Sequence, residues 1–367
     1  MSLMAILSYI AIALVSIYLG NKIGNLPFLC KKQIPSYVYW IGTGAIILTL
    51  SEMHSILFGY VIYLFLLFVL YDVVLLVVRK INKTAFEWIE RCSLNGLLIF
   101  FLSVLVAVYG YYNSFDTKVT DYTVTIAKSQ NGLENLKIVM ISDTHMGTAI
   151  KKEELDQLVN TINSMDADII CLGGDIIDEN TPKELITYTY QACGRLRSKY
   201  GTFFIIGNHE LYMEQNYLQI AKGFERYGVK ALLDETYLVE DKFYVAGRLD
   251  YDLVREGGTR KSVDQILEGI DRSLPVIMLD HQPEEYEEAK NAGVDLLLSG
   301  HTHNGQLYPG NYIILLGNEY GYGYREDGTL NTIVSSGVGT WGFAMRVGSR
   351  SEIVQVFLQI ADNSSTK

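Results

Sequence analysis

Residues 137–147, KIVMISDTHMG, decide the fold of this chain. The apolar run at 138–141 predicts a buried strand, and Asp143 and His145 follow it directly. In α/β folds the carboxyl ends of strands meet at one edge of the sheet, which is the usual place for a site. The stretch therefore predicts a sheet with a functional edge, which other polar side chains are expected to join.

The same pattern repeats over the following two hundred residues. Apolar strand candidates alternate with amphipathic helix candidates, which is typical of a sheet covered by helices. The strand candidates are 137–142, 168–174, 202–207, 275–280 and 294–300, and the helix candidates are 153–164, 183–199, 216–227, 263–272 and 284–291. Strands without intervening helices are predicted at 119–128, 232–248, 311–316, 330–337 and 351–360. We expect a layered α/β domain with mixed sheets.

Polar side chains follow each of the five predicted strands that alternate with helices. They are Asp143 and His145, then Asp175, then Asn208 and His209, then His281, and finally His301 and His303. Five of the six histidines in the chain belong to this set. Structural histidines scattered through a core or a surface would not gather in this way, so we expect one site built from these residues.

The chemistry of this set indicates metal ions. Imidazole, carboxylate and amide groups without a thiolate suit Mn²⁺, Fe or Zn²⁺, and we favour Mn²⁺. The set is too large for a single ion, so two divalent ions that share a bridging carboxylate are expected. Such a pair stabilises the attacking and leaving oxygens of an in-line displacement at phosphorus. The sequence therefore predicts a metal-dependent phosphoric ester hydrolase.

The order of these motifs resembles the calcineurin-like metallophosphoesterase superfamily, and most closely its bacterial membrane-associated branch with an N-terminal multi-span region. The motifs are D-x-H at 143–145, GD at 174–175, GNHE at 207–210, LDHQP at 279–283 and GHTH at 300–303. The resemblance extends from about residue 115 to 358, or two thirds of the chain. It implies a four-layer α/β/β/α sandwich around two metal ions.

The resemblance also implies a role for each residue at the edge. Asp143, His145 and His303 would bind the first metal, Asn208, His281 and His301 would bind the second, and Asp175 would bridge both. His209 would be the catalytic residue that is not a ligand. It would face the substrate phosphate and stabilise developing charge or protonate the leaving oxygen.

For three nearby residues the sequence leaves two interpretations open. Glu210 is expected to hold a neighbouring side chain or to cap a helix, rather than to bind metal. Asp178 either supports a ligand from behind or is a solvated loop acid. Arg346 either pairs with a substrate phosphate or forms a structural salt bridge.

The N-terminal third of the chain has the composition of a membrane domain. Four apolar segments, 3–20, 37–51, 56–78 and 94–112, approach the length of a helix that crosses hydrocarbon. A cleavable signal peptide is disfavoured for the first segment because it lacks a basic start. We predict a four-span transmembrane domain at 1–113, a connector and first strand at 114–130, a catalytic domain at 131–360 and a tail at 361–367.

The basic residues of this region predict its orientation. They cluster in two loops, with Lys22, Lys31 and Lys32 after the first span and Arg79, Lys80, Lys83 and Arg91 after the third. By the positive-inside rule these loops are cytoplasmic, so the catalytic domain of this multi-pass cell-membrane protein would be extracytoplasmic. Asp72 lies inside the third span two turns from Arg79, and a paired or helix-end charge is favoured over a functional one.

The net charge and the predicted membrane anchor together limit the range of substrates. Residues 1–113 carry a net charge of +3, which leaves −14 for the rest of a chain whose total is −11, and this argues against long nucleic acids as partners. The preferred substrate is a lipid-linked phosphate, diphosphate or phosphodiester at the outer membrane surface. One alternative is a tethered phosphodiesterase for soluble phosphoesters or small nucleotides. Another is a non-catalytic membrane sensor that binds a phosphorylated ligand.

Overall fold

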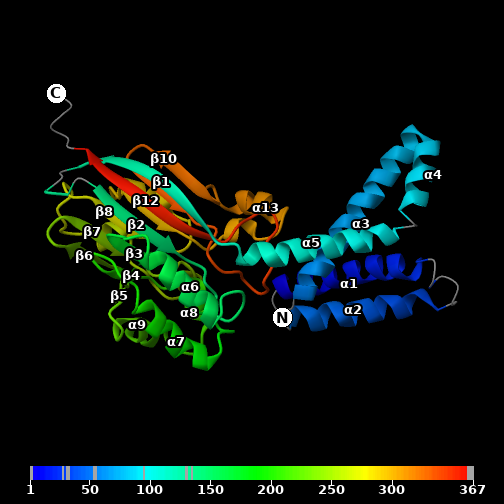
Figure 1. Ribbon diagram of the computed structural model, residues 1–367, viewed down its shortest axis with the longest axis horizontal. Coiled ribbons are helices and arrows are strands. Elements are labelled where there is room, and N and C mark those ends of the chain that lie inside the picture. Colours follow the sequence, from blue (N-terminus) through cyan, green and yellow to red (C-terminus); the bar gives the residue numbers. More distant parts are fainter. Residues whose placement is uncertain are drawn as a thin grey trace. The chain divides into compact units, whose positions relative to one another are not determined.

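The chain forms two compact units, Met1–Tyr112 and Asn113–Lys367, in a computed structural model (Figure 1). The structure describes residues 3–26, 29, 34–52, 56–93, 96–128, 131–133 and 135–361. Lys31 and Lys32, which belong to the first predicted cytoplasmic loop, lie outside the described residues, as does the predicted tail beyond Ala361.

Two six-stranded mixed sheets form the body of the second unit within the described residues. The first sheet has the order β1 (Lys118–Ala127), β12 (Glu352–Ala361), β2 (Asn135–Ile141), β3 (Ile169–Leu172), β4 (Thr202–Phe204) and β5 (Lys230–Ala231). The second has the order β10 (Gly323–Asp327), β11 (Leu330–Val334), β9 (Leu296–Ser299), β8 (Val276–Leu279), β7 (Phe243–Gly247) and β6 (Glu235–Val239). Strands β2 to β5 run parallel and β12 runs antiparallel to β2, so the prediction of mixed sheets is confirmed.

The central strands of the sheets are buried on both faces, which explains their continuous apolar runs, whereas the outer strands β1, β6 and β10 are largely exposed. In β2, Ile138 and Met140 belong to the core shared with the second sheet, whereas Val139 and Ile141 belong to the core beneath the helices. The helices over the first sheet are α6 (Lys152–Asn163), α7 (Lys183–Cys193) and α9 (Tyr217–Glu225), and those over the second are α11 (Val263–Ile266) and α12 (Tyr286–Asn291). The predicted helix at 263–272 is therefore too long; its later part contains Gly269, with a φ of 76°.

The segment 311–316 forms a helix, so its prediction as a strand is wrong. It lies in α13 (Gly310–Gly317), which follows Pro309 and ends before Asn318. Proline favours a helix start because its φ is fixed and its missing N–H is not needed there. A short apolar run fits a strand and a helix equally well by periodicity alone. The edge of the second sheet is formed by β10 instead.

Helices make up most of the described residues of the first unit. Its helices are α1 (Leu3–Gly24), α2 (Ser36–Glu52), α3 (Ile56–Ile81), α4 (Lys83–Cys92) and α5 (Leu97–Phe115), whose last turn belongs to the second unit. Among the described residues, α3 and α5 are long and apolar enough to cross a membrane, while 9–24 and 36–50 form shorter apolar helices. The four-span prediction is therefore supported for two helices. The predicted loop after the third span is instead largely the helix α4.

Asp72 on α3 is paired, but its partners come from α1 rather than from Arg79. Tyr18 donates its hydroxyl hydrogen to Asp72 Oδ2 at 2.7 Å, and Lys22 Nζ contacts Oδ1. These contacts join two helices of the first unit and satisfy a charge that would be costly alone in hydrocarbon. They support the structural interpretation of Asp72.

Candidate metal centre

The structure brings all eight predicted side chains to one edge, where strands of both sheets end. The residues follow β2 (Asp143 and His145), β3 (Asp175), β4 (Asn208 and His209), β8 (His281) and β9 (His301 and His303). All but His209 and His301 are buried, and these two are half-buried. Residues far apart in the sequence thus become neighbours because parallel strands carry them to the same edge.

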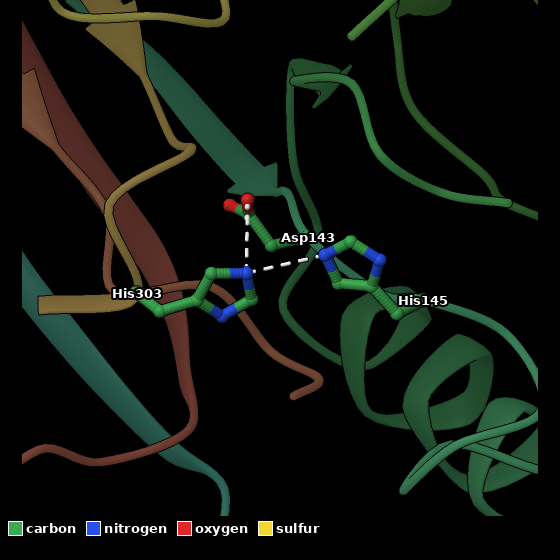
Figure 2. Close-up of side chains that lie close together, drawn as sticks. All are labelled: Asp143, His145 and His303. Atoms are coloured by element: carbon green, nitrogen blue, oxygen red, sulfur yellow. Dashed lines mark hydrogen bonds and ion pairs between the residues drawn. The ribbon is translucent and has the colours of Figure 1, made fainter. Parts of the chain in front are cut away.

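One group of potential ligands consists of Asp143, His145 and His303, and Figure 2 shows their side chains pointing toward one another. His303 Nε2 lies 3.1 Å from His145 Nε2 and 3.5 Å from Asp143 Oδ1. Behind the group, His145 Nδ1 lies 3.0 Å from Asp178 Oδ2, which fixes the orientation of the ring. The structure therefore favours Asp178 as a support over a solvated acid.

A second group consists of Asp175, His281 and His301. His281 Nε2 lies 3.0 Å from Asp175 Oδ2, and Nδ1 donates to the carbonyl oxygen of Gly173 at 2.7 Å. Because a carbonyl oxygen only accepts, Nδ1 carries a hydrogen, and in the neutral form of the ring Nε2 would present its lone pair to the cluster. Asn208 joins this group, since its Oδ1 lies 2.9 Å from His301 Nδ1.

Asp175 lies between the two groups. The same Oδ2 that approaches His281 lies 3.9 Å from His145 Nε2, and Oδ1 accepts a hydrogen bond from the His209 backbone at 2.9 Å. Burial raises the pKa of Asp175, but the surrounding imidazoles in their protonated forms, His281 first and then His209 and His145, lower it below its usual value. An ionised carboxylate therefore stands within reach of both ligand groups.

Glu210 holds the backbone that carries Asp175. Its buried carboxylate accepts hydrogen bonds from Asp175 N and Gly207 N at 2.8 Å, from Ile176 N at 2.7 Å and from Ile177 N at 3.1 Å. Burial and the charge of Asp175 raise the pKa of Glu210 to about 8, while the backbone N–H groups favour the ionised form and so oppose this rise. Glu210 thus ties the loop after β3 to the loop after β4, which agrees with the prediction that it holds neighbours rather than binding metal.

The backbone around the cluster adopts an uncommon conformation. Five of the predicted ligands have positive φ values, namely Asp143 (53°), His145 (43°), Asp175 (53°), His301 (69°) and His303 (50°). Such conformations are costly for residues with a side chain and gather at functional sites. Two glycines allow the loops to approach, because an added Cβ would lie 2.3 Å from Asp175 Oδ1 at Gly207 and 2.4 Å from Asp143 Oδ2 at Gly300.

The residues present fit divalent ions. His281 Nε2 is buried and lies 3.0 Å from Asp175 Oδ2 without the geometry of a regular hydrogen bond, as expected of two atoms that bind the same ion. Burial and the neighbouring imidazoles lower the pKa of His303 well below its usual value and that of His301 to about 4, which keeps both rings neutral. Neutral imidazoles with carboxylates suit Mn²⁺, Fe and Zn²⁺ alike.

His209 faces a pocket beside the cluster. The pocket has a volume of about 410 Å³, and its lining includes His209, Tyr212 and Trp341. His209 Nδ1 lies 2.8 Å from Glu179 Oε2. Burial would lower the pKa of His209, but the hydrogen bond to Glu179 and the charge of Asp175 raise it to about 9. The ring also lies close enough to His145 and Asp175 for its nitrogen to share a metal-sized cluster with them.

Arg346 does not face the pocket. Its side chain is fully buried and donates to the carbonyl oxygens of Ser336 and Gly339 at 2.6 Å and of His303 at 3.1 Å. The structure therefore supports neither predicted role of Arg346, the substrate contact or the salt bridge. Arg346 fixes the loops that carry His303.

Sequence reasoning did not single out Glu179, Tyr212 or Trp341. Glu179 stands beside Asp178 in a loop of polar residues, and nothing in that pattern distinguishes it. Trp341 reaches the pocket from a loop late in the chain, where no strand end predicts it. Only the three-dimensional arrangement identifies these residues.

Fold and site together define the class of protein as a metallophosphoesterase, as the sequence predicted. The chain belongs to the calcineurin-like phosphoesterase family, whose model matches residues 136–305. The matched segment contains all eight residues of the cluster.

Curated relatives support this assignment. A metallophosphoesterase of Helicobacter pylori is 30% identical over 348 residues, which cover 90% of this chain and 92% of the relative. A transmembrane protein with metallophosphoesterase domain from Danio rerio is 30% identical over 279 residues, which cover 72% of this chain and 63% of the relative. The match to a metallophosphoesterase from a second Helicobacter pylori strain has 32% identity and covers 61% of this chain and 60% of the relative. The chain thus spans less than two thirds of two of these relatives.

Proposed function

We propose that this chain is a membrane-anchored phosphoesterase that uses two divalent metal ions to hydrolyse a lipid-linked phosphate, diphosphate or phosphodiester. The main support for hydrolase activity is the position of Asp175. Its single carboxylate approaches His145 of one ligand group and His281 of the other. The catalytic domain would comprise residues 131–360, joined through 114–130 to the membrane domain at 1–113.

Each residue of the cluster has a role in this proposal. Bound ions would make water nucleophilic and neutralise charge on the phosphoryl oxygens. Asp178 orients His145 from behind, and Glu210 holds Asp175 between the two groups. Asp143, His145 and His303 would hold one ion, Asn208, His281 and His301 the other, and Asp175 both.

His209 would act on the substrate rather than hold an ion. With Nδ1 engaged by Glu179, its Nε2 remains to donate a hydrogen to a phosphoryl or leaving oxygen in the pocket. A positioned donor of this kind stabilises charge that develops only in the transition state. The half-buried position of His209 suits a residue that meets substrate.

A lipid-linked substrate is supported by how directly the two units are joined. Only Asp116 and Thr117 separate α5 from β1, so the catalytic unit follows a candidate span without a linker. Within the first unit, α3 and α5 line an apolar pocket of about 760 Å³. Such a pocket suits an acyl or prenyl chain, and relatives named as transmembrane proteins support a membrane location. The multi-pass topology with an extracytoplasmic catalytic domain follows from the positive-inside rule.

The test compares substrates on the full-length protein in vesicles, loaded with Mn²⁺. Phosphate or alcohol release from a lipid phosphate in the vesicle is compared with release from bis(p-nitrophenyl) phosphate in solution, and metal content is measured in parallel. Preference for the lipid supports the proposal. Hydrolysis of the soluble ester alone would favour the tethered phosphodiesterase. Bound metal without any hydrolysis would favour the sensor.

A further inference from the structure

We propose that α13 inserts into the lipid interface beside the metal centre and so forms a membrane-contact surface of the catalytic unit. We define this α13 surface as Tyr312, Ile313, Leu315 and Leu316, whose exposed fractions are 59%, 63%, 55% and 88%. The helix contains no charged residue, and none of its residues is buried. Large apolar side chains grouped on a surface mark an interaction site.

The loop 346–351 fixes the end of α5 within the catalytic unit. Asn113, in the last turn of α5, donates its side-chain N–H groups to the carbonyl oxygens of Arg346 at 3.0 Å and Ser349 at 2.9 Å. One residue further along, the carbonyl oxygen of Ser114 accepts a hydrogen bond from Ser351 Oγ at 2.9 Å. The end of a candidate membrane span is therefore bonded to this loop.

The same loop fixes the start of α13. The backbone N–H of Tyr308 donates to Val347 O at 2.6 Å, and Val347 N donates to Gln306 O at 3.0 Å. Helix α13 begins at Gly310, two residues after Tyr308. The start of α13 and the last turn of α5 are thus hydrogen-bonded to different residues of one short loop, so α13 lies near the C-terminal end of α5.

A lipid surface is the occupant that these observations favour. A span ends at the boundary between hydrocarbon and water, and tyrosine with aliphatic side chains is typical of segments at that depth. A second copy of the chain is disfavoured, because four side chains on an eight-residue helix fall well short of the roughly 800 Å² per partner of a standard interface.

The position of α13 also bears on the substrate, and here the inference rests on the proposed function. Gln306 lines the site pocket and exchanges hydrogen bonds with the backbone of Trp341, at 3.0 Å from Nε2 and 2.9 Å to Oε1. Only three residues separate Gln306 from α13. An inserted α13 would hold the pocket at the level of phosphate headgroups.

The test places an indole on the surface and measures its quenching by lipid. Leu316→Trp is made in the full-length protein in nanodiscs whose phosphatidylcholine is brominated near the headgroup. Leu218→Trp is the matched control, because Leu218 is an exposed leucine, at 46%, on α9 of the same unit. Since an interfacial helix buries its apolar face by about 5–10 Å, we expect the added emission of Leu316→Trp to fall by about half. The emission added by Leu218→Trp should not change.

A second variant separates insertion from tethering alone. A charge opposes insertion, so Ile313→Asp combined with Leu316→Trp should restore most of the emission. Equal quenching of the Leu316→Trp and Leu218→Trp indoles would overturn the proposal, as would quenching that Ile313→Asp leaves undiminished. The readout needs no turnover, so quenching without hydrolysis would contradict the proposed function alone, and hydrolysis of a lipid phosphate without quenching would contradict the role of α13 alone.

Discussion

Two sets of side chains meet at the edge of the sheets, and they differ in what they face. The ligand set, the seven predicted metal ligands described above, points inward around Asp175. The supporting set, Asp178, Glu179, Glu210 and Arg346, contacts site residues or their backbone from behind. In the proposed function the ligand set would bind the ions, whereas the supporting set would hold the ligands and His209 in position. Substitutions in the ligand set should therefore lower the metal content, whereas substitutions of His209 or of its support should lower the catalytic rate.

The largest effect is expected for Asp175→Ala. Loss of the shared carboxylate should release metal and lower kcat/KM by about 10³-fold or more, because the ions contribute several kcal/mol to the transition state. Metal content by elemental analysis and turnover are measured on the same sample. Full retention of both ions would contradict the bridging role.

His209→Ala should show the contrasting result. Removal of a positioned acid is expected to lower kcat by about 10²–10⁴-fold, while two ions remain bound. The measurement pairs elemental analysis with kinetics at saturating Mn²⁺. Metal loss as great as that of Asp175→Ala would refute the division between ligand and catalytic residue.

Asp178→Asn tests the support behind His145. The amide keeps the shape of the carboxylate but not its charge, so we expect metal affinity or activity to fall by about 10–100-fold. A Mn²⁺ titration monitored by activity should show recovery at high Mn²⁺. A loss that excess Mn²⁺ does not reduce would place Asp178 outside metal binding.

Glu179→Gln should have the smallest effect. The amide can still accept from His209 Nδ1, so we expect a fall in kcat of about tenfold with metal content unchanged. Wild-type kinetics with Glu179→Gln would show that the hydrogen bond to Glu179 does not position the ring. A loss of metal would instead assign Glu179 to the ligand set.

The sequence predicts the ligand set better than the supporting set, and the reason is physical. Ligands such as Asp143 and His281 follow apolar runs, so strand ends alone locate them. Glu179 and Trp341 reach the site through loop geometry, which periodicity does not encode. Arg346 is a charged residue in a core, against its usual preference, because it satisfies backbone carbonyls that two loops leave there.

The helix α13 shows the same limit for the fold. The apolar run at 311–316 predicts a strand, which would have been part of a sheet. The structure instead leaves the run exposed as a helix. In a chain with candidate membrane spans, an apolar segment can be buried either in the protein core or in lipid, and the sequence pattern alone does not distinguish the two.

The four amide hydrogens gathered by Glu210 have a consequence for metal selection. Glu210 joins the loop after β3 to the loop after β4 through four backbone hydrogen bonds, so the position of Asp175 does not rest on the ions alone. We therefore expect one divalent cation to exchange for another without a rearrangement of these loops. The occupant in a living cell would accordingly follow supply and exchange rate more than any preference built into the site's dimensions.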